Sequence, residues 1–291
     1  MRIFDPHAHM ISRVTDDYES MAAAGVIAVL EPAFWLGQPR TSVGSFVDYF
    51  DAIIGWERFR AEQFGVRHYC LIGLNPKEAN DDRVNDGVME ILPHFLEKDG
   101  VLGVGEIGYD DMTAKEEKYL VAQLELAKAE GLPALVHTPH RDKVNGAKRT
   151  LDILKDMDFP LELALIDHNT EETVPALIES GVHMGFSIYP DTKMSEERMV
   201  AILQKYGSDR MLVNSACDWG KSDPLKVPKT AALMRQSGFS DEEIEKVVWH
   251  NPIDFFARGG RLDKGELAGP AEAGAPEALY EGNTILRGER V

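Results

Sequence analysis

Apolar and polar positions alternate along the chain in a regular order, with short apolar or β-branched runs each followed by a longer amphipathic stretch. The runs that predict strands are residues 2–5, 26–31, 67–74, 101–107, 133–137, 161–167, 182–187 and 210–215. The stretches that predict helices are residues 43–64, 85–97, 113–130, 150–157, 170–179, 195–206 and 227–236. Repeated strand–helix alternation implies parallel strands joined by crossovers, and eight such units predict an α/β fold closed into a single (β/α)8 TIM barrel. A doubly wound open sheet is the competing architecture.

The C-terminal part departs from this alternation. Ser240 and Glu243 have the spacing of a capping box, which predicts one extra helix that runs to Phe256. The helical pattern ends at Gly259, and residues 268–278 are rich in Gly, Pro, Ala and Glu without a core-forming period. We therefore expect one barrel domain over residues 1–258, followed by an extended, partly disordered C-terminal tail or arm over residues 259–291.

The amino-acid composition limits the domain count, the membrane association and the cellular compartment that we expect. A chain of 291 residues, 44% of them hydrophobic, is sufficient for one large domain. No stretch approaches the roughly 20 consecutive apolar residues of a membrane span, and we expect no export signal, because the first predicted strand begins at residue 2. The cysteine count of two excludes a disulfide framework and suits a reducing cytoplasm, with Cys70 and Cys217 expected as small buried fillers.

The net charge indicates which kind of binding partner suits the chain. The 31 basic and 49 acidic residues give a formal net charge of −18. Such a field repels phosphate polymers, whereas proteins that bind nucleic acid normally carry a basic surface. The charge therefore counts against a nucleic-acid partner and favours a small-molecule substrate. Assembly into homo-oligomers is left open.

Residues suited to metal ligation recur where the predicted strands end. His7 and His9 close the first strand, and their spacing of two places both imidazoles on one face. For this pair alone, two satisfied interior histidines are the alternative. The other residues of this kind are Glu106, His137, His168 and Asp218, near the ends of the fourth, fifth, sixth and eighth strands. Catalytic groups of such barrels lie at the C-terminal ends of the strands, so we expect all six to meet at one mouth.

The position of Glu106 gives a further reason to expect a metal ion. It follows the apolar run 101–105, where an unpaired carboxylate is costly unless a positive charge neutralises it. Imidazole and carboxylate ligands suit Zn²⁺ best here, with Mn²⁺, Fe²⁺ or Mg²⁺ as alternatives. Such a centre generates hydroxide at neutral pH, and we expect this hydroxide to attack an ester, phosphoester or amide bond. Asp218 is then expected to pass the proton to the leaving group.

Several motifs together carry a family resemblance. In order and spacing, the chain is similar over residues 1–258 to the TatD-like metal-dependent hydrolases of the amidohydrolase superfamily. The motifs are Asp5-x-His7-x-His9, Gly105-Glu106-Ile107-Gly108, His137, Asp167-His168, Asp218 and Asn251-Pro252. The resemblance implies a binuclear centre with two divalent ions. In it His7, His9 and Asp218 hold one ion, His137 and His168 hold the other, and Glu106 bridges them, so that Glu106 and Asp218 are also catalytic candidates.

Three segments depart from the common family pattern, and they concern the substrate. They are residues 108–111, 137–141 and 216–220. Together with residues 31–40, these segments resemble the EboB-like branch, which is encoded in gene clusters linked to small-metabolite synthesis or traffic. The substrate-binding candidates in them are Arg141, His140, Tyr109, Trp35 and Trp219. Arginine suits anions and aromatic rings can wall a pocket, although solvated loops and aromatic packing are the alternatives.

Two other functions stay open at this point. One is a metal-dependent DNase of the TatD type, which would require a basic track on the loops. The other is a non-catalytic metal-binding component of a metabolite biosynthesis or traffic assembly. The remaining histidines away from the strand ends, His68, His94 and His183, are expected to have packing or surface roles.

Overall fold

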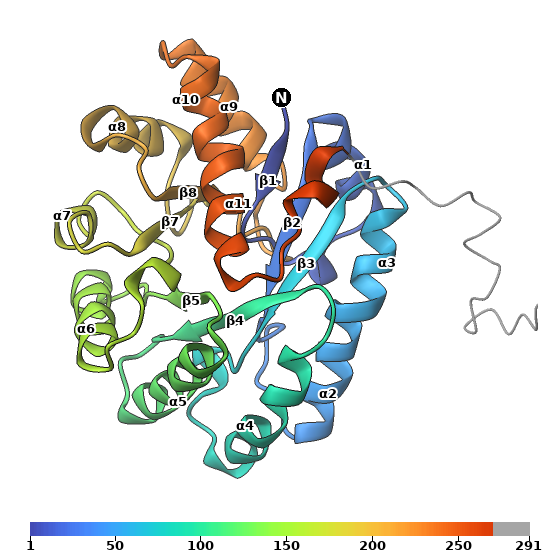
Figure 1. Cartoon of the computed structure of the whole chain (residues 1–291), viewed down its shortest axis with the longest axis vertical. Coiled ribbons are helices and arrows are strands. Elements are labelled where there is room, and N and C mark those ends of the chain that lie inside the picture. The colour runs from blue at the N-terminus through green and yellow to red at the C-terminus, as the bar shows by residue number, and fades with distance from the viewer. Residues whose placement is uncertain (270–291) are drawn as a thin grey trace, which may run out of the picture.

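Eight short parallel strands form the centre of the molecule in the computed structural model, which describes residues 1–269 (Figure 1). Each strand pairs with the next along the chain, in the order β1 to β8. They are β1 (Ile3–Asp5), β2 (Val26–Pro32), β3 (Arg67–Ile72), β4 (Val101–Gly108), β5 (Ala134–His137), β6 (Ala164–Ile166), β7 (His183–Ser187) and β8 (Met211–Asn214).

Backbone hydrogen bonds just beyond β1 and β8 bring the two edge strands together. The amide of Ala216 donates to the carbonyl of His7, and the amide of His9 donates to the carbonyl of Cys217, each at 2.8 Å. Both bonds lie at the C-terminal ends of the strands. The predicted (β/α)8 barrel is therefore confirmed.

Helices surround the strands on the outside (Figure 1). They are α1 (Thr15–Ala23), α2 (Val43–Asp51), α3 (Glu57–Glu62), α4 (Asp82–Leu96), α5 (Ala114–Glu130), α6 (Lys143–Asp156), α7 (Val174–Leu177), α8 (Glu196–Tyr206), α9 (Lys226–Gln236), α10 (Asp241–Glu245) and α11 (Asn251–Phe256). Two π-helical segments, η2 (Ala52–Trp56) and η5 (Lys246–His250), join α2 to α3 and α10 to α11. Short 3-10 turns complete the set: η1 (Met10–Ser12), η3 (Pro76–Glu78), η4 (Leu161–Leu163), η6 (Ala257–Gly259) and η7 (Lys264–Ala268).

Most predicted helices are confirmed, with three differences. The predicted helix over residues 43–64 is the segment α2–η2–α3, and the capping box of Ser240 and Glu243 starts α10 as expected. The short α1 was not predicted, and α6 begins at Lys143 instead of residue 150. The helix predicted over residues 170–179 is only the four-residue α7. There the hydroxyl of Thr173 hydrogen-bonds to Asn169 and Thr170, and such local bonds compete with a helical first turn.

The interior of the barrel is apolar toward the N-terminal ends of the strands. Inward side chains from successive strands form this layer, because alternate residues of a strand face opposite sides. They include Phe4, Leu30, Leu71, Leu102, Leu135, Leu165 and Leu212. Trp249 and Phe256 join the same cluster, together with Leu262 and Leu267. The barrel bottom is thus covered by the C-terminal part of the described chain.

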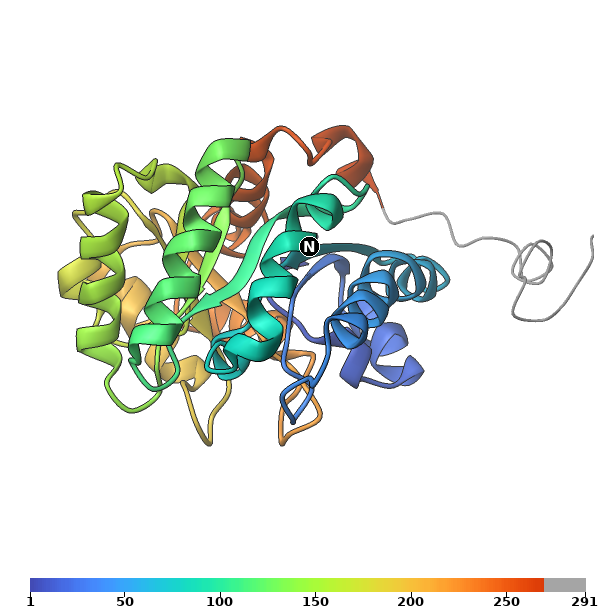
Figure 2. The same cartoon turned by 90° about the horizontal axis from the view of Figure 1, so that it is seen from below.

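The predicted tail divides at this point. Residues 259–269 reach the barrel bottom and bury Leu262 and Leu267, and residues 270–291 lie outside the described residues. Figure 2 shows this segment at one end of the barrel, with the loops after β2, β7 and β8 projecting from the opposite end. Among the helices of residues 1–269, none combines the length and apolar character required to cross a membrane.

Candidate metal centre

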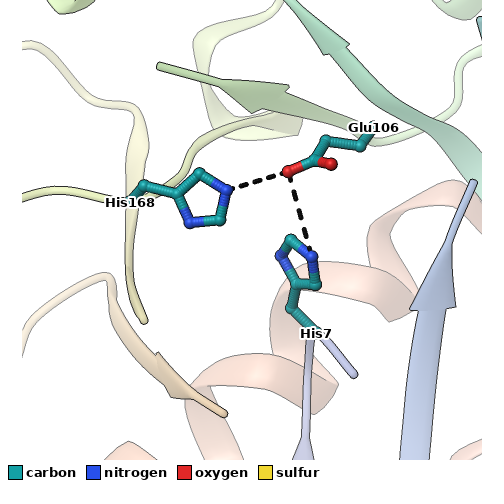
Figure 3. A group of neighbouring side chains, drawn as sticks. All are labelled: His7, Glu106 and His168. Atoms are coloured by element: carbon teal, nitrogen blue, oxygen red, sulfur yellow. Dashed lines mark hydrogen bonds and ion pairs between the residues drawn. The ribbon is translucent and has the colours of Figure 1, made fainter. Parts of the chain in front are cut away.

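Five of the six predicted ligands converge above the apolar layer, at the C-terminal mouth of the barrel. His7, His9, Glu106, His137 and His168 are all buried. The Oε1 atom of Glu106 lies 2.8 Å from Nδ1 of His137, 2.9 Å from Nε2 of His168 and 3.9 Å from Nε2 of His7. Figure 3 shows His7 and His168 directed at this oxygen from two sides. The Nε2 atoms of His7 and His9 are 3.0 Å apart.

The proton position on His7 follows from its neighbour Asp167. Nδ1 of His7 donates to Oδ2 of Asp167 at 2.6 Å, so Nε2 presents a lone pair to the centre. The other carboxylate oxygen of Asp167 accepts from the backbone amide of His168 at 2.7 Å and from the amide of Asn214 at 3.1 Å. Burial alone would raise the pKa of Asp167, but His168 and His7 hold it below its usual range. Asp167 is therefore ionised and acts only as an acceptor.

A second chain of hydrogen bonds orients His168. The hydroxyl of Ser187 donates to Oδ1 of Asn214 at 2.7 Å, so its oxygen accepts from Nδ1 of His168 at 2.6 Å. Nε2 of His168 then presents a lone pair to Oε1 of Glu106 at 2.9 Å. Two acceptor atoms so close in a buried site repel each other unless a cation or a proton lies between them.

The charge states also suit a cation. Burial lowers the pKa of His9 and His168 well below the usual range, so both imidazoles are neutral, as metal ligands must be. Burial would raise the pKa of Glu106, but His137 and His168 outweigh it and the pKa lies well below normal. Nε2 of His137 and Nδ1 of His9 are buried without a hydrogen-bond partner among the described residues.

The donor set as a whole fits a divalent metal. Ligand atoms of His7, Glu106 and His168 lie within 4.8 Å of one another, and neutral imidazoles with a carboxylate suit Zn²⁺, Mn²⁺ or Fe²⁺.

Asp218, the sixth predicted ligand, lies at the same cavity but is held differently. Its Oδ1 accepts from the hydroxyl of Tyr189 at 3.0 Å and from the amide of Gly220 at 2.8 Å. A Cβ on residue 220 would lie 2.2 Å from the Tyr189 hydroxyl, so glycine allows this contact. Nη1 of Arg13 donates to the carbonyl of Asp218 at 2.7 Å and fastens the loop after β8. Within residues 1–269, no hydrogen bond or ion pair joins the Asp218 carboxylate to the other five ligands.

The predicted substrate residues separate into two groups. Trp35 and His140 line a cavity of about 230 Å³ that also borders Glu106. Trp219 is 47% exposed, with its ring 6.2 Å from that of Trp35. Tyr109 is buried and donates to Glu117 of α5, and Arg141 is exposed on the loop after β5. None of Trp219, Tyr109 and Arg141 is among the described residues that line the cavity.

Sequence reasoning missed three polar residues of the cavity, Asn75, Lys77 and Lys193. Asn75 donates to the second carboxylate oxygen of Glu106 at 3.0 Å, and Nζ of Lys193 lies 3.4 Å from Nε2 of His168. All three follow β3 or β7, so the positional rule that identified the ligands could have indicated them. The direction in which a loop turns its side chains has no comparable signal in the sequence.

Comparisons with known proteins agree with this geometry. A family model described as TatD related DNase matches residues 4–257. An uncharacterized metal-dependent hydrolase of Methanocaldococcus jannaschii is 28% identical over 257 residues, which cover 87% of this chain and 99% of the relative.

Solved structures agree as well. The TatD-like protein from Archaeoglobus fulgidus is 25% identical with a TM-score of 0.73, and the match covers 87% of this chain and 99% of that one. The phosphotriesterase homology protein from Escherichia coli, 16% identical with a TM-score of 0.66 over 88% of this chain and 98% of that one, shares the fold. The EboB-like assignment stays a prediction. By its family match, its relative and the residues at its barrel mouth, the chain belongs to the TatD family of metal-dependent hydrolases.

Proposed function

We propose that the chain is a binuclear metal-dependent hydrolase that cleaves an ester, phosphoester or amide bond of a small metabolite, with Zn²⁺ as the first candidate metal. The observation that carries the proposal is the position of Glu106. Imidazole nitrogens from three different strand ends face its Oε1, at 2.8, 2.9 and 3.9 Å. A carboxylate approached by ligand atoms from several sides is suited to bridging two cations.

The ligands divide into two groups around that carboxylate. His7 and His9, with Asp218, are proposed for one ion, and His137 and His168 for the other. His137 and His168 have ring centroids 4.6 Å apart, and the facing Nε2 atoms of His7 and His9 are 3.0 Å apart. When bound, such ions supply Lewis-acid polarisation of the substrate and a nucleophile at neutral pH.

The other groups at the mouth would act on the substrate directly. Asp218, which accepts from Tyr189 and Gly220, is proposed to move the proton to the leaving group. The aromatic rings of Phe34 and Trp35 close one side of the cavity and limit the entry of water. A cavity of about 230 Å³ suits a small metabolite better than a polymer.

The substitution Glu106→Gln tests the bridging role. It removes the bridging charge and leaves two cations to repel each other, so the bound metal should fall below two ions per chain. Turnover on a panel of phosphate esters, carboxyl esters and lactones should fall by at least roughly tenfold. Elemental analysis and kinetics measure both, with Glu97→Gln at an exposed position of the α4 terminus as the control. Metal that saturates at one ion per chain in the wild type would defeat the binuclear proposal.

A DNase activity is the second candidate, because the matching family model is described as a TatD related DNase. The net charge of −18 favours weak DNA binding by the metal-free protein. Electrophoretic mobility and cleavage of single-stranded DNA test this, with and without divalent metal. Tight binding by metal-free protein that weakens steeply with added salt would favour the DNase.

A further inference from the structure

Three lysines gather at the mouth of this acidic barrel. Lys77 and Lys193 line the cavity that borders the metal ligands. Lys143 is the first residue of α6, and its Nζ donates at 3.2 Å to Oγ1 of Thr138, the residue after His137. The three come from the segments that follow β3, β7 and β5, so the fold alone brings them together. This local positive charge runs against the formal net charge of −18.

Two of the three lysines form no direct ion pair with any of residues 1–269, although the carboxylates of Glu106, Asp167 and Asp218 lie close enough to act on Lys193. Lys77 pairs with Asp110, with Nζ 2.8 and 2.9 Å from the two carboxylate oxygens. Over residues 1–269, neither Lys143 nor Lys193 forms an ion pair with a carboxylate, and both are half-buried. An ammonium that is partly withdrawn from water without an anionic partner is unfavourable. A bound anion would supply that partner.

The positive charges of all three lysines affect the same residue, His140. The pKa of His140 is lowered to about 3, mainly by burial and then by the nearby Lys193, His137, Lys143 and Lys77. The His140 ring lies nearly parallel to that of His168, with centroids 6.4 Å apart. The region of positive potential therefore lies directly beside the metal ligands.

Part of the cavity wall is aromatic. The ring of Phe34 stacks on that of His9, with centroids 4.0 Å apart and planes at 14°. Trp35 lies beside it, and Nζ of Lys77 is 5.3 Å from the centre of the Trp35 ring. The cavity can thus hold a negative group near its lysines while its aromatic rings pack against an apolar or planar part of the same molecule.

We propose that Lys193 and Lys143 form an anion-binding subsite that holds a phosphate or carboxylate group of the substrate beside the metal centre. Phe34 and Trp35 cover the apolar part of the same molecule. The inference rests on the proposed function, because the subsite serves the substrate of that centre. Lys193 is the main contact. Once Nε2 of His168 is used as a ligand it has no lone pair for Lys193, and the ammonium is free to bind the substrate.

Calorimetric titration of the metal-loaded protein with inorganic phosphate and with benzoate tests the subsite. Lys193→Met keeps the length of the side chain and removes the charge. It should therefore raise the Kd of whichever probe binds the wild type more tightly by at least about tenfold. Lys193→Arg should keep most of the affinity, and Lys143→Gln should show a smaller loss. Lys246→Met is the control, because Lys246 lies on η5 and pairs with Asp209 at the surface. Metal content should equal that of the wild type in every variant.

The outcomes separate the two sources of anion and the two proposals. Tighter binding of phosphate indicates a phosphate ester as substrate, and tighter binding of benzoate indicates a carboxylate. The subsite is refuted if neither probe binds the wild type, or if Lys193→Met and Lys143→Gln bind both probes as the wild type does. Loss of metal in Lys193→Met would also refute it, since Lys193 would then support a ligand. Binding requires no turnover, so lysine-dependent binding without hydrolysis counts only against the proposed function.

Discussion

At the scale of single residues, hydrogen bonds on one side of an imidazole decide what the other side can bind. Asp167 accepts a hydrogen bond from Nδ1 of His7, and Ser187 accepts one from Nδ1 of His168, so both Nε2 atoms face Glu106 as acceptors. Partners of this kind affect metal affinity although they never touch the metal. Asp167 stands beside a predicted ligand in the sequence, but its role depends on contacts that the fold creates.

A second buried pair, Glu31 and His68, ties β2 and β3 to the loop that carries His9. One oxygen of Glu31 accepts from the amide of Ile11 at 3.0 Å, and the other lies 2.8 Å from Nε2 of His68. Burial raises the pKa of Glu31 to about 8 and lowers that of His68 to about 4. Near neutral pH the proton is therefore on the carboxyl group, which donates to the imidazole. The packing role expected for His68 is confirmed by its burial.

Glu31→Gln should reduce the pH dependence of stability. The pKa of Glu31 is raised on folding from its ordinary 4.5 to about 8, so its contribution is complete below 4.5 and is lost as the pH rises through about 8. Glutamine keeps one acceptor and one donor and does not ionise. From about pH 5 to about pH 9, the variant should lose less free energy of unfolding than the wild type. Urea denaturation of metal-free protein measures it, with Glu130→Gln at an exposed site of α5 as the control.

Parallel curves for the wild type and Glu31→Gln over this pH range would mean that Glu31 does not titrate as stated.

At the scale of elements, neighbouring strands must leave room for the side chains that orient the ligands. β7 does so at Gly185, where a Cβ would lie 2.2 Å from Oδ1 of Asp167. The carbonyl of Gly185 also accepts from the amide of Asn169 at 2.9 Å, so the β6–α7 loop is fastened to β7 at this point. The site thus depends on the absence of a side chain on a strand that supplies no predicted ligand.

Gly185→Ala should weaken metal binding, because the added methyl group displaces Asp167 and with it the imidazole of His7. We expect metal affinity to fall by roughly tenfold or more and stability to fall by about 1–3 kcal/mol. Competition with a chromophoric chelator measures the first and urea denaturation the second. Gly55→Ala is the matched control, since a Cβ there meets nothing within 4 Å. Metal affinity equal to that of the wild type would show that Asp167 can move without affecting His7.

At the scale of the whole molecule, the two ends of the barrel have different tasks. The mouth holds buried polar groups, and the opposite end holds an apolar cluster that includes Trp249, Phe256 and Leu267. In such barrels the C-terminal end of the strands carries catalysis and the other end carries stability. The two properties should therefore respond to different substitutions.

Leu267→Ala tests this separation. Leu267 is 1% exposed, and truncation of a buried leucine costs about 2–5 kcal/mol of unfolding free energy. Metal affinity should be unchanged, because the residue packs at the end away from the ligands. Denaturation and metal titration of the same samples measure both, with Val14→Ala at a 64% exposed position as the control. A parallel loss of metal affinity would show that the two ends are coupled.

The sequence alone determined the architecture and most of the centre. Eight apolar runs separated by helical patterns predict the barrel, because the period of a strand and that of a helix are local properties. The rule that active groups follow barrel strands then assigned His7, His9, Glu106, His137 and His168 to one mouth, where they converge. The capping box at Ser240 is local as well and was predicted correctly.

Only the tertiary structure decided what depends on contacts between distant segments. The Asp218 carboxylate accepts hydrogen bonds from Tyr189 and Gly220, and the predicted helix over residues 170–179 is shortened to the four residues of α7. The part of the predicted tail up to residue 269 covers the barrel bottom. The lysines at the mouth were missed because a net charge is a sum over the chain, whereas the potential at a site depends on which loops lie side by side. Side-chain direction in loops has no periodic signal, so the environment of the substrate emerges only from the folded molecule.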